Sequence, residues 1–347
     1  MNSLILRRFV ALRVAACAVL LLCCVASATR AQQPEQDEVI DVESRLVRLN
    51  IGVADRKGQP ITNLTAADFV VYEDGAAQKI TSFEPVTTPF SVVLLLDLSG
   101  STQGFRQTLK QSAIRFLDAL APGDRIAVVV FNREARTLVE FTSDRRKIAY
   151  AIEIAEGRTP QTELYGALQY SLKQLARETN RRKAIVVMTD GVDTSISRLD
   201  RQAAAAATTP EQAASSVKLD ADARLPNVLN MADRQGVTIY PLALPSGDIK
   251  RIREPNLIQV AVYTAARGRL ETLTTRTGGR IHDIRRLEDM GRLYAEVAAD
   301  MRTLYSISYQ PTSSATPPAR GTWRPIRIEV TTRTGLLART REGYFAR

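Results

Sequence analysis

The sequence predicts an α/β fold with a doubly wound, mostly parallel sheet, joined to a small β-sandwich-like unit built from the chain ends. Continuous apolar runs at 92–96, 126–131 and 184–188 are typical of strands buried on both faces of a parallel sheet. Between these runs apolar residues recur at helical spacing, which predicts helices packed on that sheet. Near both ends of the 347-residue chain apolar residues alternate with others, which is typical of half-buried strands. A chain of this length exceeds one average domain, so we expect a large domain and a smaller one.

The first 31 residues predict a secretory signal peptide. Three arginines precede an apolar stretch at 14–26, and small residues then allow cleavage after Ala28 or Ala31. We therefore expect an exported protein that is periplasmic, on the cell surface or secreted. The apolar stretch is shorter than the about 20 residues that span a membrane. An uncleaved anchor is the alternative, and the mature chain is expected to have no membrane span.

The mature chain is predicted to have three segments. They are an N-terminal β unit at 32–88, the α/β domain at 89–310 and C-terminal β-strands at 311–347. In the first segment, "FVVYEDGAAQKITSF" at 69–83 predicts two strands joined by a turn at Asp74-Gly75. In the last segment, apolar residues alternate at 326–330. We expect the strands of the two terminal segments to pair with each other.

The α/β domain shows its elements in alternating order. Strands are expected at 92–96, 126–131, 184–188 and 237–242, and helices at 105–120, 145–155, 164–175, around Leu273 and at 287–301. Residues 198–225 are rich in Ala, Thr and Asp and form either a helix or a disordered insertion. We expect this segment and the loop at 246–256 to lie near the end of the strand at 184–188.

Composition excludes several classes of function. All three cysteines lie in the signal segment, so the mature chain has no disulfide, thiolate metal site or cysteine nucleophile. Without the four arginines of that segment, the net charge falls from +10 to +6. No dense basic run with interleaved aromatic residues occurs, so a nucleic-acid partner is not expected. The "RRK" runs at 145–147 and 181–183 are interpreted as solvated ends of helices or strands.

Three polar clusters follow or precede these elements at positions that suit a ligand. Asp97, Ser99 and Ser101 come directly after the strand at 92–96, Thr162 precedes a helix, and Asp190 follows the strand at 184–188. Open α/β sheets bind ligands beyond the carboxyl ends of their strands. Carboxylate and hydroxyl oxygens suit Mg²⁺, with Mn²⁺ or Ca²⁺ as alternatives. A Zn²⁺ site would normally recruit His or Cys, and the mature chain has His282 alone.

The order D-x-S-x-S, distant Thr, distant T-D-G resembles the von Willebrand factor A (VWA) domain with its metal-ion-dependent adhesion site (MIDAS). "TELYGAL" at 162–168 and "MTDGVDT" at 188–194 match its later parts, and the resemblance covers roughly 90–310. The layout is also similar to that of VWFA-related proteins of acidobacteria, through "ADFVVYEDGAAQKI" and the terminal "GYF". Thr159 lies near Thr162, and "EGRTPQT" departs from the family's usual Gly-rich run.

The resemblance implies a role for each site residue. Ser99, Ser101 and Thr162 would bind the metal through their hydroxyls, whereas Asp97 and Asp190 would act through waters or hydrogen bonds. A dication held mainly by neutral hydroxyls stays under-neutralised and can accept a carboxylate. The expected partner is therefore a protein that supplies an acidic residue. The sequence does not reveal the partner's identity or the oligomeric state.

Other interpretations remain open at this point. Ser99 and Ser101 could cap the following helix, and Asp190-Gly191 could be a simple turn. Asp193 and Asp124 are interpreted as turn residues, and His282 as the start of a strand.

A non-enzymatic binding module is the main hypothesis for the function. A phosphatase with an Asp nucleophile would need a second acid at the position of Ser99. The G-x-S-x-G and G-x-G-x-x-G motifs that mark two other enzyme classes are absent. The alternatives are a scaffold with a non-functional metal site and, less favoured, a metal-dependent hydrolase.

Overall fold

The computed structural model describes residues 46–157, 161–312 and 321–346, which all lie within one compact unit. The segment 1–31, which predicts a signal peptide, lies outside the described residues, as does most of the lead-in to the first strand. No helix among the described residues is both long enough and apolar enough to cross a membrane.

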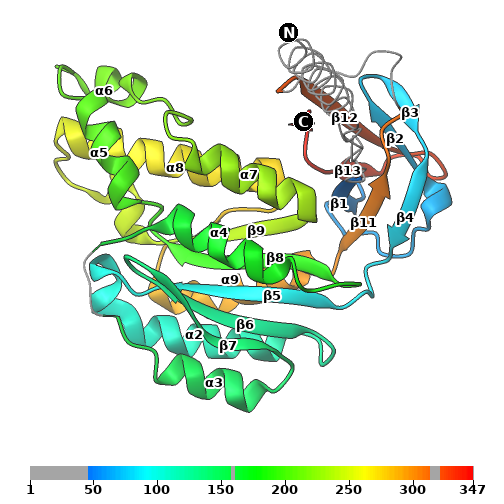
Figure 1. Ribbon diagram of the computed structural model, residues 1–347, viewed down its shortest axis with the longest axis horizontal. Helices are drawn as coiled ribbons and strands as arrows, with labels where there is room; N and C mark the ends of the chain where they lie inside the picture. Colours follow the sequence, from blue (N-terminus) through cyan, green and yellow to red (C-terminus); the bar gives the residue numbers. More distant parts are fainter. Residues whose placement is uncertain (1–45, 158–160, 313–320, 347) are drawn as a thin grey trace, which may run out of the picture. The chain divides into compact units, whose positions relative to one another are not determined.

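A six-stranded sheet forms the centre of the large domain (Figure 1). Its strand order is β10-β9-β8-β5-β6-β7. The strands are β5 (Phe90–Asp97), β6 (Arg125–Phe131), β7 (Ala135–Thr142), β8 (Arg182–Thr189), β9 (Val237–Ala243) and β10 (His282–Asp283). Five of them run parallel, and the edge strand β7 pairs antiparallel with β6. The predicted mostly parallel sheet is confirmed, whereas β7 had not been expected.

Helices cover both faces of this sheet (Figure 1). One face packs against α2 (Arg106–Ala119), α3 (Arg145–Glu153) and α9 (Met290–Met301). The other packs against α4 (Leu164–Leu175), α5 (Thr194–Ala203), α7 (Arg224–Gln235) and α8 (Leu257–Thr277). Alternate residues of β5 enter the two cores, Leu94 one and Leu95 the other, and both are fully buried. Burial of each such side chain contributes about 1.5–3 kcal/mol to the free energy of folding. The apolar run therefore favours a central position for β5 in the sheet.

The Ala-rich insertion at 198–225 is folded, which decides between the two expectations for it. It contains the end of α5, the helix α6 (Pro210–Ser216) and the start of α7. Thr209 caps α6, with Pro210 at the first helical position. Ala213 is buried against Ala261 of α8.

The described residues also contain five short 3-10 helices. They are η1 (Ala66–Asp68), η2 (Gly100–Phe105), η3 (Pro245–Gly247), η4 (Ile249–Arg251) and η5 (Leu287–Asp289).

The chain ends form two four-stranded sheets around a shared apolar core. The first has the order β13 (Leu337–Arg339), β1 (Val47–Ala54), β11 (Leu304–Tyr309), β4 (Ile80–Glu84). The second has the order β14 (Gly343–Phe345), β12 (Trp323–Val330), β2 (Phe69–Glu73), β3 (Ala76–Gln78). In these sheets, β13 pairs with β1 and β12 with β2. Asp74 and Gly75, with φ of 50° and 81°, form the predicted turn between β2 and β3.

Strand β11 belongs to the sandwich, although the sequence analysis placed residues up to 310 in the α/β domain. It lies between β1 and β4, with Ile307 opposite Leu49 on one side and Phe83 on the other. Its inward side chains Tyr305, Ile307 and Tyr309 are fully buried. An alternating pattern shows which face of a strand is buried, but it does not identify the sheet that receives it.

The basic run at 181–183 is not solvated, which corrects the interpretation from charge. Arg182 and Lys183 open β8 and are only 4% and 7% exposed. The Arg182 guanidinium donates to the backbone carbonyls of Val86 at 2.6 Å, Thr88 at 2.8 Å, Met301 at 3.3 Å, and also Leu304. Four backbone acceptors replace the water that a charged side chain normally needs.

Candidate functional site

Asp97 ends the central strand and is completely buried. Its Oδ1 accepts a hydrogen bond from the Ser99 backbone N–H at 2.9 Å, and its Oδ2 accepts one from the Thr189 hydroxyl at 3.2 Å. Ser99 is buried at the N-cap of η2, and its carbonyl accepts from the Thr102 hydroxyl at 2.9 Å. Ser101 lies in η2, but its side chain is outside the described part of the structure.

Asp190 reaches the same edge of the sheet from the neighbouring strand. β8 pairs in parallel with β5, and Leu96 lies opposite Met188, so Asp97 and Asp190 follow adjacent strand ends. The Asp190 Oδ1 accepts from the Val192 backbone N–H at 3.0 Å, as in an Asx-turn. The structure therefore contains the turn that was the alternative interpretation. A turn of this kind also fixes the direction of the carboxylate.

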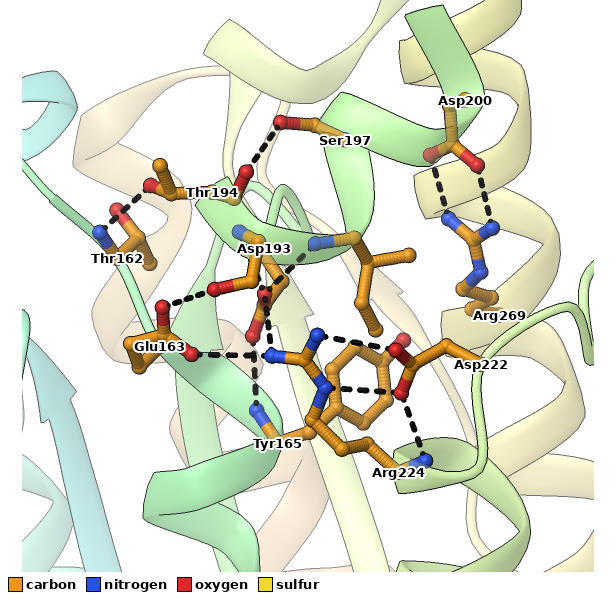
Figure 2. Close-up of polar contacts among 12 residues, drawn as sticks. Thr162, Glu163, Tyr165, Asp193, Thr194, Ser197, Asp200, Asp222, Arg224 and Arg269 are labelled. Atoms are coloured by element: carbon orange, nitrogen blue, oxygen red, sulfur yellow. Dashed lines mark hydrogen bonds and ion pairs between the residues drawn. The ribbon is translucent and has the colours of Figure 1, made fainter. Parts of the chain in front are cut away.

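Thr162 is tied to the loop after β8 by two reciprocal hydrogen bonds. Its backbone N–H donates to the Thr194 hydroxyl at 2.9 Å (Figure 2). In return, the Thr194 N–H donates to the Thr162 carbonyl at 2.8 Å. Thr162 is 7% exposed and lies just before α4. The structure thus places four of the five predicted site residues, Asp97, Ser99, Thr162 and Asp190, in three loops at one sheet edge.

The Asp97 carboxylate is buried and lies close enough to a second acid, Asp190, to feel its charge. Burial and, to a smaller extent, the negative charge of Asp190 raise the pKa of Asp97 to about 7. Hydrogen bonds from Ser99 and Thr189 act in the opposite direction. A cation would relieve both causes of the raised pKa, because it would favour the ionised form of each acid. The donor set of carboxylate and hydroxyl oxygens fits a hard cation such as Mg²⁺.

Hydroxyl ligands are essential to such a site. Within the described ranges, no three His, Cys, Asp or Glu side chains gather as a metal-binding group. Two carboxylates alone would leave most of the six positions around Mg²⁺ to other ligands. The loops that carry Ser99, Ser101 and Thr162 supply the hydroxyls that could fill them, together with water.

Arg106 joins two of the site loops. Its guanidinium donates to the carbonyls of Leu98 at 2.9 Å, Ser99 at 3.1 Å and Gly157 at 3.2 Å. A Cβ at Gly157 would lie 2.1 Å from the Leu98 carbonyl oxygen, so the close approach of the two loops requires glycine. Neither residue belongs to the D-x-S-x-S pattern, so neither was predicted from the sequence.

Asp193 has a larger role than the turn that was expected of it. It is 3% exposed and caps α5, with Oδ1 accepting from the backbone N–H of Ser195 at 3.1 Å and of Ile196 at 3.2 Å. Its Oδ2 accepts from the Tyr165 N–H at 3.2 Å (Figure 2). An Asp just before a helical stretch is a helix-start signal, so capping could have been predicted.

The other two structural expectations agree with the structure. Asp124 lies in a turn, where it accepts from the backbone N–H of Phe90 at 2.8 Å and of Ala121 at 2.9 Å. His282 begins β10, as expected.

A family model described as "von Willebrand factor type A domain" matches residues 92–192. This range begins in β5 and ends just after Asp190. An uncharacterized protein from Synechocystis sp. is 34% identical over 109 residues, which cover 30% of this chain and 25% of that protein. The match thus spans a quarter of the length of this curated relative.

Several solved structures are similar to the chain at low sequence identity. The von Willebrand factor domain of the type V pili tip protein Mfa5 from Porphyromonas gingivalis is 17% identical, covering 66% of this chain and 99% of that one, with a TM-score of 0.46. A von Willebrand factor type A structure from Catenulispora acidiphila is 10% identical, covering 88% and 74%, with a TM-score of 0.46. Proximal thread matrix protein 1 from the mussel byssus, with a zinc-occupied MIDAS motif, is 15% identical, covering 66% and 49%, with a TM-score of 0.42.

The family match and the observed topology cover the same part of the chain. The matched range includes β5, β6 and β8, the three adjacent central strands of the parallel sheet. It also includes the loops that carry all five predicted site residues. The chain therefore contains a von Willebrand factor type A domain.

Proposed function

We propose that the protein is an exported, metal-dependent protein-binding module used in adhesion or assembly. Mg²⁺, or alternatively Mn²⁺ or Ca²⁺, would be held by the hydroxyls of Ser99, Ser101 and Thr162. Asp97 and Asp190 would orient these ligands and the water between them. A partner protein would supply a carboxylate as the last ligand. The signal-like pattern of residues 1–31 supports export.

The convergence of three loops at one sheet edge carries this proposal. The adjacent strands β5 and β8 bring Asp97 and Asp190 together, and the paired backbone bonds of Thr162 and Thr194 hold the third loop beside them. The polar residues of these loops are far apart in the sequence, and the fold brings them to one edge of the sheet. Ligand sites of open α/β sheets lie at this edge.

The surroundings of Asp97 favour binding over catalysis. Both of its oxygens accept hydrogen bonds and the side chain is fully buried, so it is not placed to attack a substrate. The Thr189 hydroxyl also accepts from the Gly191 N–H at 3.1 Å, which directs its proton toward Asp97. A bound dication would supply a positive charge with a coordination position open to an incoming carboxylate. The chain's own residues hold the loops in place.

Titration calorimetry with MgCl₂ and MnCl₂ tests the metal site. We expect saturable binding by the wild-type protein and a loss of affinity of about tenfold or more in Asp97→Asn, which keeps the volume of the side chain. Asp118→Asn is the matched control, because Asp118 is an exposed acid on α2 outside the site. A folded wild-type protein that binds neither ion would overturn the metal site and favour the scaffold alternative.

Partner capture tests the binding function separately. We expect an acidic protein from the native envelope fraction to be retained in MgCl₂ and released by EDTA. Asp97→Asn should lose this retention, whereas Asp118→Asn should keep it. Retention that is indifferent to both EDTA and Asp97→Asn would contradict a carboxylate–metal bridge.

A further inference from the structure

We infer that Arg224 is a positioning residue for the proposed metal site, through which the folded insertion holds the Thr162 loop in place. The inference rests on the proposed function, because it assigns to Arg224 an effect on ion affinity. Arg224 is the first residue of α7 and lies near the end of the insertion at 198–225. It lies 62 positions after Thr162 in the sequence and has no place in the D-x-S-x-S, Thr, Asp pattern.

The Arg224 guanidinium lies among three carboxylates (Figure 2). Its Nη1 is 3.2 Å from Glu163 Oε2 and 3.7 Å from Asp193 Oδ1. Its Nε and Nη2 donate to the two oxygens of Asp222, at 2.8 and 3.0 Å. The Asp222 bonds fix the plane of the guanidinium, because a bidentate pair has one geometry. The remaining nitrogen then points at the acids beside the site.

Glu163 transmits this contact to Thr162, its neighbour in the chain. The Glu163 Oε1 accepts a hydrogen bond from the Ser195 hydroxyl, and Oε2 accepts from Arg224. The residue before Ser195, Thr194, makes the reciprocal bonds to the Thr162 backbone. The Thr162 loop is therefore held on one side by the loop after β8 and on the other by Arg224.

The charges of Glu163 and Asp193 explain why a positively charged side chain is needed between them. Asp193 is buried, and both its burial and the nearby charge of Glu163 raise its pKa, whereas Arg224 acts to lower it. Without Arg224, the two carboxylates would repel each other across the gap between the Thr162 loop and the start of α5. Like charges in a partly desolvated place are unfavourable. We expect the loop carrying Thr162 to move away from α5.

A residue of α8 anchors the insertion, and this fixes the segment that carries Arg224. Arg269 of α8 donates to the Leu219 carbonyl at 3.0 Å and pairs with Asp200 of α5. Both members of this ion pair are at most 3% exposed. The backbone N–H of Arg224 donates to Asp222 Oδ1 at 2.8 Å, which fixes the entry into α7. The cation beside the site thus comes from the insertion and not from the sheet.

The test compares Arg224→Gln with Arg125→Gln, which breaks a similar ion pair elsewhere. Arg125 is 42% exposed and pairs with Glu178 at 3.0 Å at the beginning of β6, the opposite edge of the same sheet. Each substitution removes one positive charge. We expect Arg224→Gln to weaken Mn²⁺ binding in titration calorimetry about tenfold and Arg125→Gln to leave it unchanged. Arg224→Lys should have an intermediate affinity for Mn²⁺, because Lys keeps the positive charge but not the planar guanidinium that binds a carboxylate through two nitrogens.

Hydrogen exchange in EDTA gives a second readout that needs no bound ion. The amides of Thr162, Glu163 and Tyr165 donate to Thr194, Asn132 and Asp193. We expect a peptide covering 161–166 to exchange faster in Arg224→Gln than in wild type, and not in Arg125→Gln. Glu163→Ala removes the acceptor oxygens of the same link without a change in the insertion, and serves if Arg224→Gln does not fold.

The outcomes separate this inference from the proposed function. Wild-type protein without saturable Mn²⁺ binding overturns the proposed function, and this inference with it. If Arg224→Gln and Glu163→Ala bind Mn²⁺ with the same affinity as wild type, the inference alone is overturned. Weakened binding in both variants, with unchanged binding in Arg125→Gln, supports it. In the double variant Arg224→Gln, Glu163→Ala, we expect no greater loss of Mn²⁺ affinity than in either single variant, because both substitutions act through one link.

Discussion

The guanidinium of Arg269 donates to both carboxylate oxygens of Asp200, at 2.8 and 2.6 Å, and neither side chain is more than 3% exposed. The pair joins α8 to α5. Arg269 also donates to the Leu219 carbonyl, so one guanidinium holds two helices and the end of the insertion. A buried ion pair of this kind depends on both partners, because each neutralises the other.

Removing one partner of this pair should destabilise the protein strongly. We expect Arg269→Met to lower the free energy of unfolding by about 3–5 kcal/mol, because Asp200 is left as a buried unpaired charge. The double variant Arg269→Met, Asp200→Leu should lose less than Arg269→Met alone. Urea unfolding followed by circular dichroism measures both. A double variant less stable than the single one would contradict this view of the pair.

Arg182 should be important for stability although it lies at a strand end. We expect Arg182→Gln to lower the free energy of unfolding by about 3 kcal/mol, because up to four buried carbonyls lose a charged donor. Arg177→Gln is the control, since Arg177 is exposed and precedes the same strand. Denaturant midpoints that shift equally in the two variants would show that the four carbonyl contacts contribute nothing.

A fragment comprising residues 89–310 should be less stable than one comprising 46–347. The cut removes β1 and β4, the two neighbours of β11, and exposes Tyr305, Ile307 and Tyr309. These side chains bury large apolar surfaces in the complete sandwich. We expect a lower thermal midpoint and a greater tendency to aggregate, measured by scanning calorimetry and light scattering. Equal midpoints for the two fragments would mean that β11 does not depend on the sandwich.

His282 should make the protein sensitive to mild acid. Burial lowers the pKa of His282 below its usual 6.5, against the opposing charges of Glu296 and Asp300 and with that of Arg280. The unfolded chain then binds a proton that the folded chain resists, so stability is full above pH 6.5 and is lost below it. We expect the stability advantage of wild type over His282→Gln to shrink as the pH falls from 7 to 5.

The stability of wild type has to be compared with that of His282→Gln, because Asp97 also titrates. In metal-free protein, protonation of Asp97 increases stability as the pH falls, whereas protonation of His282 decreases it. The pKa of Asp97 is raised to about 7 from 3.8, so the folded chain binds the proton first and stability rises as the pH falls through that window. The difference between wild type and His282→Gln cancels this contribution. Urea unfolding in EDTA at several pH values gives the difference. Parallel curves for the two proteins would rule out a role for His282.

Local pattern was enough to predict the buried parallel strands of the central sheet and the place of the acids, although not the edge strand β7. Every residue of the run at 92–96 is apolar, so its burial on both faces and the position of Asp97 at its end follow from the sequence. The same holds for the run at 184–188 and Asp190. The turn at Asp74-Gly75 also follows from local chemistry, because Gly accepts a positive φ freely and Asp tolerates one.

Contacts between distant residues could not be predicted in this way. Glu163 and Arg224 are 61 positions apart and carry no shared spacing signal. Arg182 looked like part of a solvated basic run because its acceptors are backbone carbonyls, which every residue possesses. The sequence of β11 did not indicate its partners Leu49 and Phe83. Each of these depends on the three-dimensional arrangement of loops and not on residue type.

The pairing of β1 with β11 has a consequence for the order in which the chain folds. Val47 lies opposite Tyr309, so the first strand has no partner until roughly 260 further residues have been synthesised, and contacts so distant in sequence form slowly. The strands β5, β6 and β8 are much closer together in the chain. We expect the α/β sheet to assemble first and the sandwich to close last. Until that closure, β1 and β4 present open edges at which nascent chains can associate.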